Sequence, residues 1–369
     1  MLDLGAQRRR LGATLTTAID AVLARGDFVM GEEVGRLEAA LADRAGGVEV
    51  VSCASGTDAL VLALRALGVG PGDAVVVPAF TFAATAEAVA LVGARPVFAD
   101  VRRGAFDLDP ASLAEAAARA RPHPRGVVVV DLFGQPADHA AIARVAQAHD
   151  LFVLADAAQS FGATAGGEAV GRLAPVTTTS FYPTKPLGAF GDGGAVLTTD
   201  DGVAAAVRSL RNHGSVPEDP YRHVRIGLAS RLDTLQAAVL LAKLTVFDDE
   251  LRRRREVAAR YTDELADVVT VPTPIDGTTS AWAQYTITSP HRDALRHGLG
   301  AAGVASAVHY PRALIDQPAF AELEQVVPLD RSRALADAVL SLPIHPYLTD
   351  EQVAHVIATV RSVAERLDG

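Results

Sequence analysis

The sequence predicts an α/β protein in which helices flank a mostly parallel central sheet and a smaller α+β domain follows towards the C-terminus. Two observations lead to this fold class. Short apolar segments typical of buried strands alternate with helical segments through the first two thirds of the 369 residues. After Gly227 the alternation stops and a long helical segment begins. We therefore expect a large domain over residues 1–240 and a small domain over residues 241–369.

The expected strands are short, apolar and separated by helices or turn residues. They cover residues 48–51, 74–78, 95–99, 126–131, 151–156, 176–182 and 194–199. The helices expected between them cover residues 56–67, 81–92 and 137–149. Wholly apolar strands separated by helices are typical of a parallel sheet that is covered on both faces.

The segment after Gly227 predicts a change of architecture. Residues 230–267 have the apolar spacing of one nearly continuous helix, which at about 1.5 Å per residue would cross from one domain into the other. A short β segment at residues 283–288 and a helix at residues 350–367 follow. These elements predict the smaller α+β domain.

Composition and charge favour an ordinary globular protein and argue against nucleic acid as a partner. The chain is 49% hydrophobic and 21% charged, with a formal net charge of −10. Nucleic-acid binding needs a basic surface. The run Arg252–Arg255 lies between acidic residues in a helical segment, so we expect a solvated face with ion pairs.

The single cysteine and the apolar segments favour a cytoplasmic protein. One cysteine, Cys53, cannot form an internal disulfide, and we expect it to be a buried structural thiol. The first residues lack a basic-then-apolar signal pattern. Pro78 and Glu87 interrupt the most apolar stretch, so we expect no membrane span.

The chain has only two lysines, Lys185 and Lys243, because arginine supplies nearly all its positive charge. A lysine amine can lose its proton and form a Schiff base, whereas arginine cannot. Lys185 lies between a β segment and a glycine-rich turn, in a loop where such chemistry is plausible. Lys243 occupies the polar position of an amphipathic helix, and we expect it on the surface.

Two strand ends carry residues that suit an anionic ligand with a ring nitrogen, because ligands of open α/β sheets bind at the carboxyl ends of strands. The turn at Gly56 and Thr57 opens a helix whose N–H groups can bind phosphate, although a plain helix cap is the alternative. Asp156 ends an apolar strand, and Gln159 follows one helical turn later. A buried carboxylate needs a cationic or N–H partner. Asp131 ends another strand and is a rival by position.

The third segment places Ser180 five residues before Lys185. The glycines that follow, Gly188, Gly191, Gly193 and Gly194, predict a hairpin turn. A phosphate-binding turn, a strand-end aspartate and a lysine beside a serine are together what pyridoxal phosphate requires. The carboxylate keeps the pyridine nitrogen protonated, and the lysine forms the Schiff base.

Longer stretches resemble the DegT/DnrJ/EryC1/StrS family of pyridoxal-phosphate sugar aminotransferases, which have the fold type I architecture. The resemblance runs from Leu2 to Pro346, almost the whole chain. The similar stretches are residues 26–31, 55–60, 78–82, 156–160, 180–194, 211–214, 230–238 and 309–311.

The resemblance implies roles for individual residues. Lys185 would form the Schiff base with pyridoxal 5'-phosphate and later move the proton, and Asp156 would pair with the pyridine nitrogen, which makes these two residues the catalytic pair. The other implied cofactor ligands are Gln159 for the ring hydroxyl, Phe82 for stacking on the ring, and Gly56, Thr57 and Ser180 for the phosphate. The family pattern implies no metal ion.

The resemblance also implies a homodimer with shared active sites. His309 and Tyr310 match a segment that contacts the nucleotide sugar, and the segment containing Arg231 would reach the site of the neighbouring subunit. Members usually have an asparagine two residues before this arginine, where it contacts the cofactor phosphate across the dimer, but this chain has Ala229. A lost charge-assisted hydrogen bond is worth roughly 1.5–3 kcal/mol, so we expect weaker cofactor retention.

The implied reaction moves an amino group from glutamate to a keto group of a nucleotide sugar. The stretches 185–188 and 225–244 are most similar to enzymes that aminate carbon 3 of a UDP-2-acetamido-3-keto-hexuronate, where Arg231 would pair with the uronate carboxylate. Members that act on neutral sugars have the same arginine, so Arg231 alone does not settle the substrate. A dTDP-keto-deoxysugar or a keto-cyclitol from an antibiotic pathway remains an alternative substrate. A non-catalytic or regulatory protein is another alternative, because Ala229 departs from the pattern. A related branch removes a hydroxyl group, but it has histidine in place of Lys185.

Overall fold

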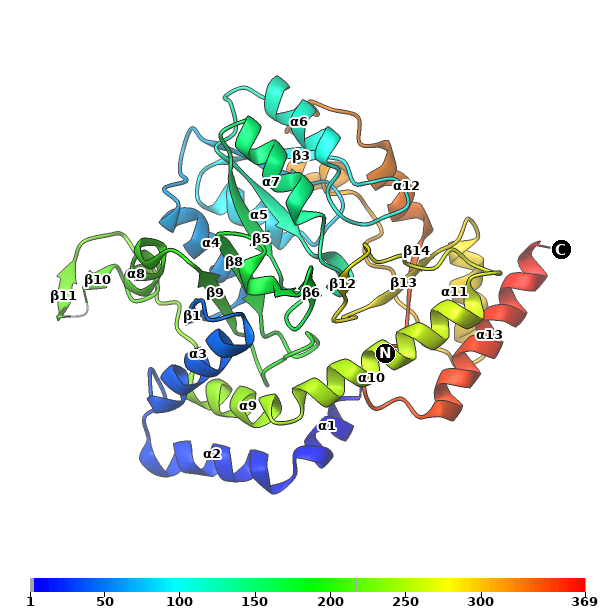
Figure 1. Ribbon diagram of the computed structural model, residues 1–369, viewed down its shortest axis with the longest axis horizontal. Helices are drawn as coiled ribbons and strands as arrows, with labels where there is room; N and C mark the ends of the chain where they lie inside the picture. The colour runs from blue at the N-terminus through cyan, green and yellow to red at the C-terminus, as the bar shows by residue number, and fades with distance from the viewer. Residues whose placement is uncertain (1–2, 217, 369) are drawn as a thin grey trace.

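The structure is a computed structural model that describes residues 3–216 and 218–368 (Figure 1). Leu2, where the family resemblance begins, lies outside the described residues. A central seven-stranded sheet has the order β1-β9-β8-β5-β4-β2-β3. All neighbouring pairs are parallel except those that involve β9, which is antiparallel to both β1 and β8. The predicted α/β class with a mainly parallel sheet is therefore confirmed.

The seven strands occupy the segments expected from the sequence, with shifts of one or two residues at their ends. Their bounds are β1 Glu49–Cys53, β2 Ala74–Pro78, β3 Arg95–Ala99, β4 Gly126–Val130, β5 Phe152–Asp156, β8 Val176–Ser180 and β9 Gly194–Thr198. The ends of β1 and β8 each differ by two residues; the expected strand at β8 reached residue 182. The chain leaves the sheet at Ser180 because it enters the loop of residues 181–193.

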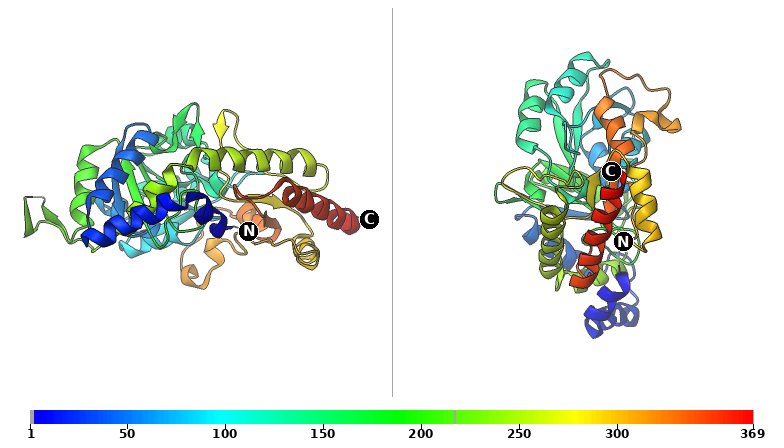
Figure 2. Two further views of the ribbon diagram at one scale, coloured as in Figure 1. Left: turned by 90° about the horizontal axis from the view of Figure 1, so that it is seen from below. Right: turned by 90° about the vertical axis from the view of Figure 1, so that its right-hand side faces the viewer.

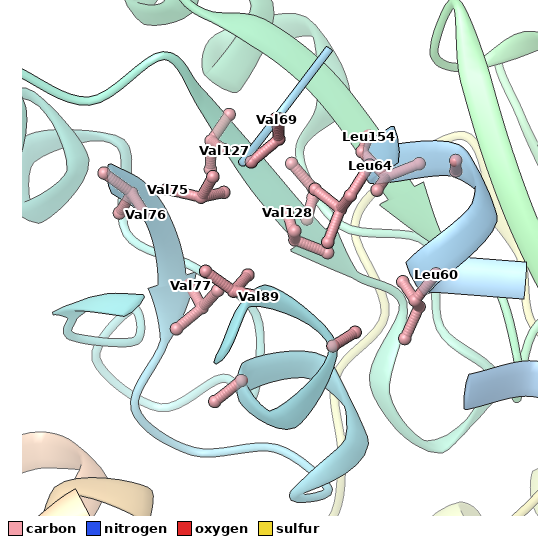
Figure 3. Close-up of a cluster of buried hydrophobic side chains, with 14 of the residues drawn as sticks. Leu60, Leu64, Val69, Val75, Val76, Val77, Val89, Val127, Val128 and Leu154 are labelled. Atoms are coloured by element: carbon pink, nitrogen blue, oxygen red, sulfur yellow. The ribbon is translucent and has the colours of Figure 1, made fainter. Parts of the chain in front are cut away.

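Both faces of the sheet pack on helices that connect its parallel strands. These helices include α4 Gly56–Ala66, α5 Ala84–Leu91, α6 Pro110–Arg119 and α7 His139–Ala148. Figure 3 shows the centre of this core, where side chains from β2, β4 and β5 meet those of α4 and α5. Val76, Val128, Leu154 and Leu64 are fully buried there. The wholly apolar strands predicted this two-sided burial.

A second buried cluster lies against the loop of residues 181–193. It joins α3 Glu32–Arg44 and α9 Thr234–Leu244 to the strands β1 and β9. Phe181, Leu187 and Ala189 anchor the loop in this cluster, and each is at most 2% exposed. The loop is therefore held by apolar packing along much of its length.

The long helix expected over residues 230–267 is wrong, because the segment forms two helices. They are α9 and α10 Phe247–Leu265, with a break at Thr245 and Val246. The Thr245 hydroxyl donates a hydrogen bond to the carbonyl of Ala242, a back-bond that competes with helix continuation. In Figure 1, α9 lies beneath the central sheet and α10 extends towards the C-terminal helix.

The C-terminal part has a buried cluster of its own. The strands β13 Tyr285–Thr288 and β14 Val339–Leu342 pair antiparallel, and α10, α11 Arg292–Ala301 and α13 Asp350–Asp368 pack around them. This separate core supports the proposed small domain, whereas its boundary at residue 240 stays a prediction. Residues near Phe320 pack back on the first cluster beside Phe98.

The arginine run on α10 differs from the expected solvated face. Arg252 forms an ion pair with Glu256, as expected. Arg254 is only 5% exposed and donates to the backbone carbonyls of Trp282 and Ile344. Burial lowers the pKa of Arg254 to about 10. The expectation is wrong for Arg254, because this side of α10 packs in the C-terminal cluster with Trp282 and Ile344. Among the described helices, none is both long and apolar enough to cross a membrane.

Asp131, the strand-end rival of Asp156, is a structural residue. It is 1% exposed and accepts hydrogen bonds from the Ala137 amide at 2.9 Å, the His139 ring at 2.8 Å and the Ser160 hydroxyl at 2.8 Å. These three donors tie the end of β4 to α7 and to the turn after β5. Asp131 therefore joins neighbouring connections of the sheet.

We predict that Asp131→Ala lowers the free energy of unfolding by about 3 kcal/mol, because it leaves three buried donors without their acceptor. Urea denaturation followed by circular dichroism measures this loss. Asp138→Ala is a matched control, because Asp138 only caps α7 through the Ala141 amide and should contribute about 1 kcal/mol. Equal losses in the two variants would contradict the structural role of Asp131.

Candidate active site

Lys185 lies in the loop of residues 181–193, at the carboxyl end of β8. The loop closes on itself through the Phe181 amide, which donates to Gly193 at 2.7 Å, and the Ala189 amide, which donates to Phe181 at 2.7 Å. A Cβ atom at Gly188 would lie 2.6 Å from the carbonyl oxygen of Pro183, so only glycine fits there. Tight backbone contacts therefore fix the turn around Lys185, which confirms its expected place in a loop.

The Lys185 amine and the Asp156 carboxylate interact electrostatically. Burial lowers the pKa of Lys185, and the negative charge of Asp156 opposes this shift. Burial raises the pKa of Asp156, and three groups oppose it. They are the Ala158 amide at 3.1 Å, the Thr85 hydroxyl at 3.0 Å and the charge of Lys185. The site therefore combines an amine that loses its proton more readily with a carboxylate that hydrogen bonds keep in place.

The start of α4 packs directly on Ser180. A Cβ atom at Gly56 would lie only 2.6 Å from the Cβ of Ser180, so glycine is required for this approach. Ser55 caps the helix by accepting from the Asp58 amide at 3.0 Å. The amides of Gly56 and Thr57 belong to the first helical turn, where backbone N–H groups lack intrahelical acceptors. Together with the Ser180 hydroxyl they are donors suited to an anion.

Gln159, Tyr310 and Phe82 form one wall beside this centre. The Gln159 side chain accepts from the Phe133 amide at 2.6 Å and donates to the Tyr310 hydroxyl at 3.2 Å. The Tyr310 ring lies 5.9 Å from the ring of Phe82, measured between centroids. Phe82 is 53% exposed, so its ring is accessible for stacking on a planar ligand.

His309 comes to the same centre from the C-terminal part of the chain. Its Nδ1 atom lies 2.9 Å from the Ser341 hydroxyl of β14. Burial lowers the pKa of His309, and the charge of Lys185 lowers it further. His309 therefore favours the neutral form and senses the charge of Lys185. The structure brings His309 and Tyr310 to residues that precede them by more than 100 positions in the sequence.

Arg231 lies apart from these residues. Its guanidinium donates to the Asn212 side chain at 3.3 Å, and none of its contacts in the described part of the chain involves Lys185 or Asp156. The neighbouring Ser230 points inward and donates to Asp58 at 2.6 Å. Ala229, on the other side of Ser230, is exposed. Ala229 and Arg231 therefore flank an inward-facing residue and are available to a second molecule.

Sequence reasoning missed Thr85 and placed Lys243 wrongly. Thr85 donates to Asp156, but a threonine inside an expected helix carries no signal for that contact. Lys243 was expected on the surface, yet it is 2% exposed and its Nζ donates to the Gly188 carbonyl at 2.5 Å. The apolar spacing of α9 predicted that Lys243 lies on the polar face of the helix. It did not predict that the loop containing Gly188 covers this position.

The residues present fit a phosphorylated pyridine that carries an aldehyde. The Lys185 amine suits the aldehyde and Asp156 suits a protonated ring nitrogen. The start of α4 with Ser180 suits the phosphate. Phe82 and Gln159 suit the face and edge of the ring. Each functional group of such a ligand therefore has a partner of matching chemistry in one region of the protein.

Comparisons with known proteins agree with this chemistry. Residues 10–361 match the DegT/DnrJ/EryC1/StrS aminotransferase family. The UDP-2-acetamido-2-deoxy-3-oxo-D-glucuronate aminotransferase of Pseudomonas aeruginosa is 44% identical over 97% of this chain and 98% of its own. A crystal structure of an aminotransferase of this family from Brucella abortus has a TM-score of 0.95 at 44% identity and covers 98% of both chains.

A further solved structure contains a cofactor. NtdA from Bacillus subtilis, with bound cofactor PMP, has a TM-score of 0.89 at 28% identity and covers 95% of this chain and 81% of its own. The family match spans nearly the whole chain, so its amino-transfer chemistry and its pyridoxal 5'-phosphate cofactor extend to this protein. The protein is therefore a sugar aminotransferase and belongs to the DegT/DnrJ/EryC1/StrS aminotransferase family.

Proposed function

We propose that the protein transfers an amino group from glutamate to carbon 3 of a UDP-2-acetamido-3-keto-hexuronate. The main support for amino-transfer chemistry is the electrostatic interaction of Lys185 with Asp156, close to the anion site at the start of α4. The name of the Pseudomonas aeruginosa relative supports the choice of sugar. Arg231 supports an acidic sugar, because a guanidinium binds a carboxylate through two parallel hydrogen bonds.

The residues would divide the work as follows. Bound pyridoxal 5'-phosphate supplies an electron-withdrawing ring that stabilises negative charge on the carbon next to the transferred nitrogen. Lys185 would hold the cofactor covalently through Nζ. Once released, its amine would act as a general acid and base and carry the proton between the two carbons bonded to the transferred nitrogen. Asp156 would bind the ring nitrogen and Gln159 the ring hydroxyl. Phe82 would stack on the ring, and Gly56, Thr57 and Ser180 would bind the phosphate.

We also propose that the protein forms a homodimer in which each subunit completes the site of the other. Apolar side chains are exposed close to the start of α9. Phe28, Val29 and Met30 are 45–50% exposed, and the backbone of Val29 forms a bridge to Asp233. Ile226 is 85% exposed a few residues before Arg231. Exposed apolar groups that gather in this way are typical of protein interfaces.

A projecting hairpin lies just before Ile226 in the sequence. The strands β10 Ser215–Val216 and β11 Asp219–His223 extend from the end of the molecule opposite the C-terminus (Figures 1 and 2). Tyr221 in this hairpin is 89% exposed. In the proposed dimer these exposed segments cover the neighbouring active site. Arg231 then reaches the sugar bound in the partner's site, whereas His309 and Tyr310 contact the sugar bound in their own subunit.

Cys53 supports the proposed location in the cytoplasm. It is fully buried, as expected for a structural thiol, and has no disulfide partner. Burial raises the pKa of the Cys53 thiol to about 12, so that it is unreactive at neutral pH. A single buried thiol is typical of a reducing compartment.

The substrate proposal predicts the outcome of a half-reaction. We expect glutamate to bleach the visible absorbance of the loaded protein, and the 3-keto-hexuronate to restore it after glutamate is removed. The corresponding neutral 3-keto-hexose should react roughly 30–100-fold more slowly, because it lacks the charge-assisted hydrogen bonds to Arg231. Stopped-flow absorbance measures both rates, and a dTDP-keto-deoxysugar and a keto-cyclitol complete the panel.

Two variants are controls for this assay. Arg231→Met should remove the preference for the acidic sugar while the bleaching by glutamate remains. Lys185→Arg keeps the charge and the fold but should abolish covalent cofactor attachment. Fastest restoration by the dTDP sugar or the cyclitol would overturn the proposed substrate, and covalent attachment in Lys185→Arg would overturn the role of Lys185.

The electrostatics of the site predict a pH dependence. Burial lowers the pKa of Lys185. The rate at which cofactor-free protein attaches added pyridoxal phosphate should therefore rise with pH, and the midpoint of this rise should lie below the usual lysine pKa of about 10.4. Asp156 raises this pKa, so Asp156→Asn should move the midpoint to lower pH. Asp131→Asn is the matched control and should not move it. A midpoint that moves upward in Asp156→Asn would contradict the assigned interaction.

The exposed position of Ala229 leads to a further prediction. Ala229→Asn should tighten pyridoxal phosphate binding by about tenfold or more, because it adds a hydrogen bond from the neighbouring subunit to the phosphate. Fluorescence titration of the cofactor-free dimer measures the dissociation constant. Ala229→Val is the control for side-chain size and should have no such effect. If Ala229→Asn binds the cofactor no more tightly than the wild type, the proposed contact across the dimer is wrong.

A further inference from the structure

Lys243, the second lysine of the chain, lies behind the loop that carries Lys185. Its ammonium group donates to the carbonyl of Gly188 at 2.5 Å and lies 4.5 Å from the centroid of the Phe190 ring. Both partners belong to the loop of residues 181–193, and Gly188 follows Lys185 by three residues. Lys243 is 2% exposed, so its ammonium group is shielded from water, whereas Phe190 is 42% exposed.

A second residue of α9 holds the same loop. The Gln236 side chain accepts a hydrogen bond from the Phe190 amide at 2.8 Å. Gln236 and Lys243 are seven residues apart, which places them on the same face of a helix two turns apart. The loop is therefore held by α9 at two points. Gly188, which accepts from Lys243, is nearer to Lys185 in the sequence than Phe190, which donates to Gln236.

The partners of Lys243 are unusual for a buried cation. Among the described residues, no ion pair joins Lys243 to a carboxylate within 4.0 Å, although the charge of Glu250 raises the pKa of Lys243. Burial outweighs this effect and lowers the pKa of Lys243 to about 8, so that most of the group is still protonated at pH 7. A buried charge without a close counter-ion lowers stability relative to an apolar side chain of similar size. Packing alone therefore does not account for a lysine at this position.

We propose that Lys243 is a positioning residue for Lys185. Its cation holds the Gly188 carbonyl and the Phe190 ring, and thereby fixes the turn so that the Lys185 amine points towards Asp156. The carbonyl of Gly188 has a strong donor only while Lys243 occupies this place. The inference rests on the proposed role of Lys185, and both lysines then serve one site.

The test compares Lys243→Met, which keeps the length of the side chain but removes its charge, with Lys243→Arg, which keeps a cationic donor. In cofactor-free protein, we expect Lys243→Met to increase hydrogen exchange of the amides of residues 182–190 at least tenfold. In the loaded enzyme, we expect kcat to fall at least tenfold while the KM for glutamate changes less than threefold. Lys243→Arg should recover at least half of both effects on a logarithmic scale.

Val239→Ala is the matched control. Val239 lies one helical turn before Lys243 on α9 and is 2% exposed, but it packs in a different cluster, with Leu11 and Leu15. We expect Val239→Ala to lower Tm and to leave the exchange of residues 182–190 unchanged. Lys243→Met should lower Tm less than Val239→Ala does, because it removes a buried charge. Val239→Ala should therefore have the larger effect on Tm, and Lys243→Met the larger effect on loop exchange. This difference separates a positioning role from a general effect on stability.

The outcomes distinguish this inference from the proposed function. If loop exchange and kcat in Lys243→Met match those of Val239→Ala, the positioning role is wrong, whatever Lys185 does. If Lys243→Arg recovers neither effect, the ammonium contact with Gly188 is not what matters, and the inference is also overturned. Borohydride reduction followed by peptide mass mapping identifies the residue that attaches pyridoxal phosphate. Attachment elsewhere than Lys185 would overturn the proposed function and leave the loop measurements in cofactor-free protein interpretable.

Discussion

The close contact between the start of α4 and Ser180 is the constraint on which the rest of the site depends. Gly56 has no side chain, so the first turn of the helix can reach the end of β8. This contact places backbone N–H groups beside a serine hydroxyl and fixes the point at which the chain leaves the sheet. The loop that follows carries Lys185 only a few residues later. The contact between Gly56 and Ser180 therefore positions both the anion site and the reactive amine.

The break between α9 and α10 lets the same segment serve two purposes. Before Thr245, α9 packs on the large sheet domain and holds the Lys185 loop through Gln236 and Lys243. After the break, α10 packs in the C-terminal core with β13 and β14. That C-terminal part returns His309 and Tyr310 to the centre formed by the large sheet. The two parts of the chain thus share one site, and a small buried cluster that contains Phe133 and Val339 joins their cores.

The two aspartates at strand ends show how local context separates structure from chemistry. Asp131 is surrounded by three protein donors, which use its carboxylate to join neighbouring connections. Asp156 accepts from Thr85 and Ala158 and also interacts with the charge of Lys185. The sequence pattern is the same for both, an aspartate after a run of apolar residues. Only their neighbours in space differ, and those neighbours come from distant segments.

The sequence by itself determined the order of the seven central strands, the position of Lys185 in a loop and the motif around Gly56, because these features depend on neighbours a few residues away. Its periodicity also showed which residues of α9 are polar. The tertiary structure decided that Lys243 and Arg254 are buried, that α9 ends at a break, that Thr85 contacts Asp156, and that Tyr310 meets Gln159. A polar position on a helix faces water only if nothing covers it, and what covers it is another segment of the chain. Long-range packing therefore settled the environment of each group whose identity the sequence had already shown.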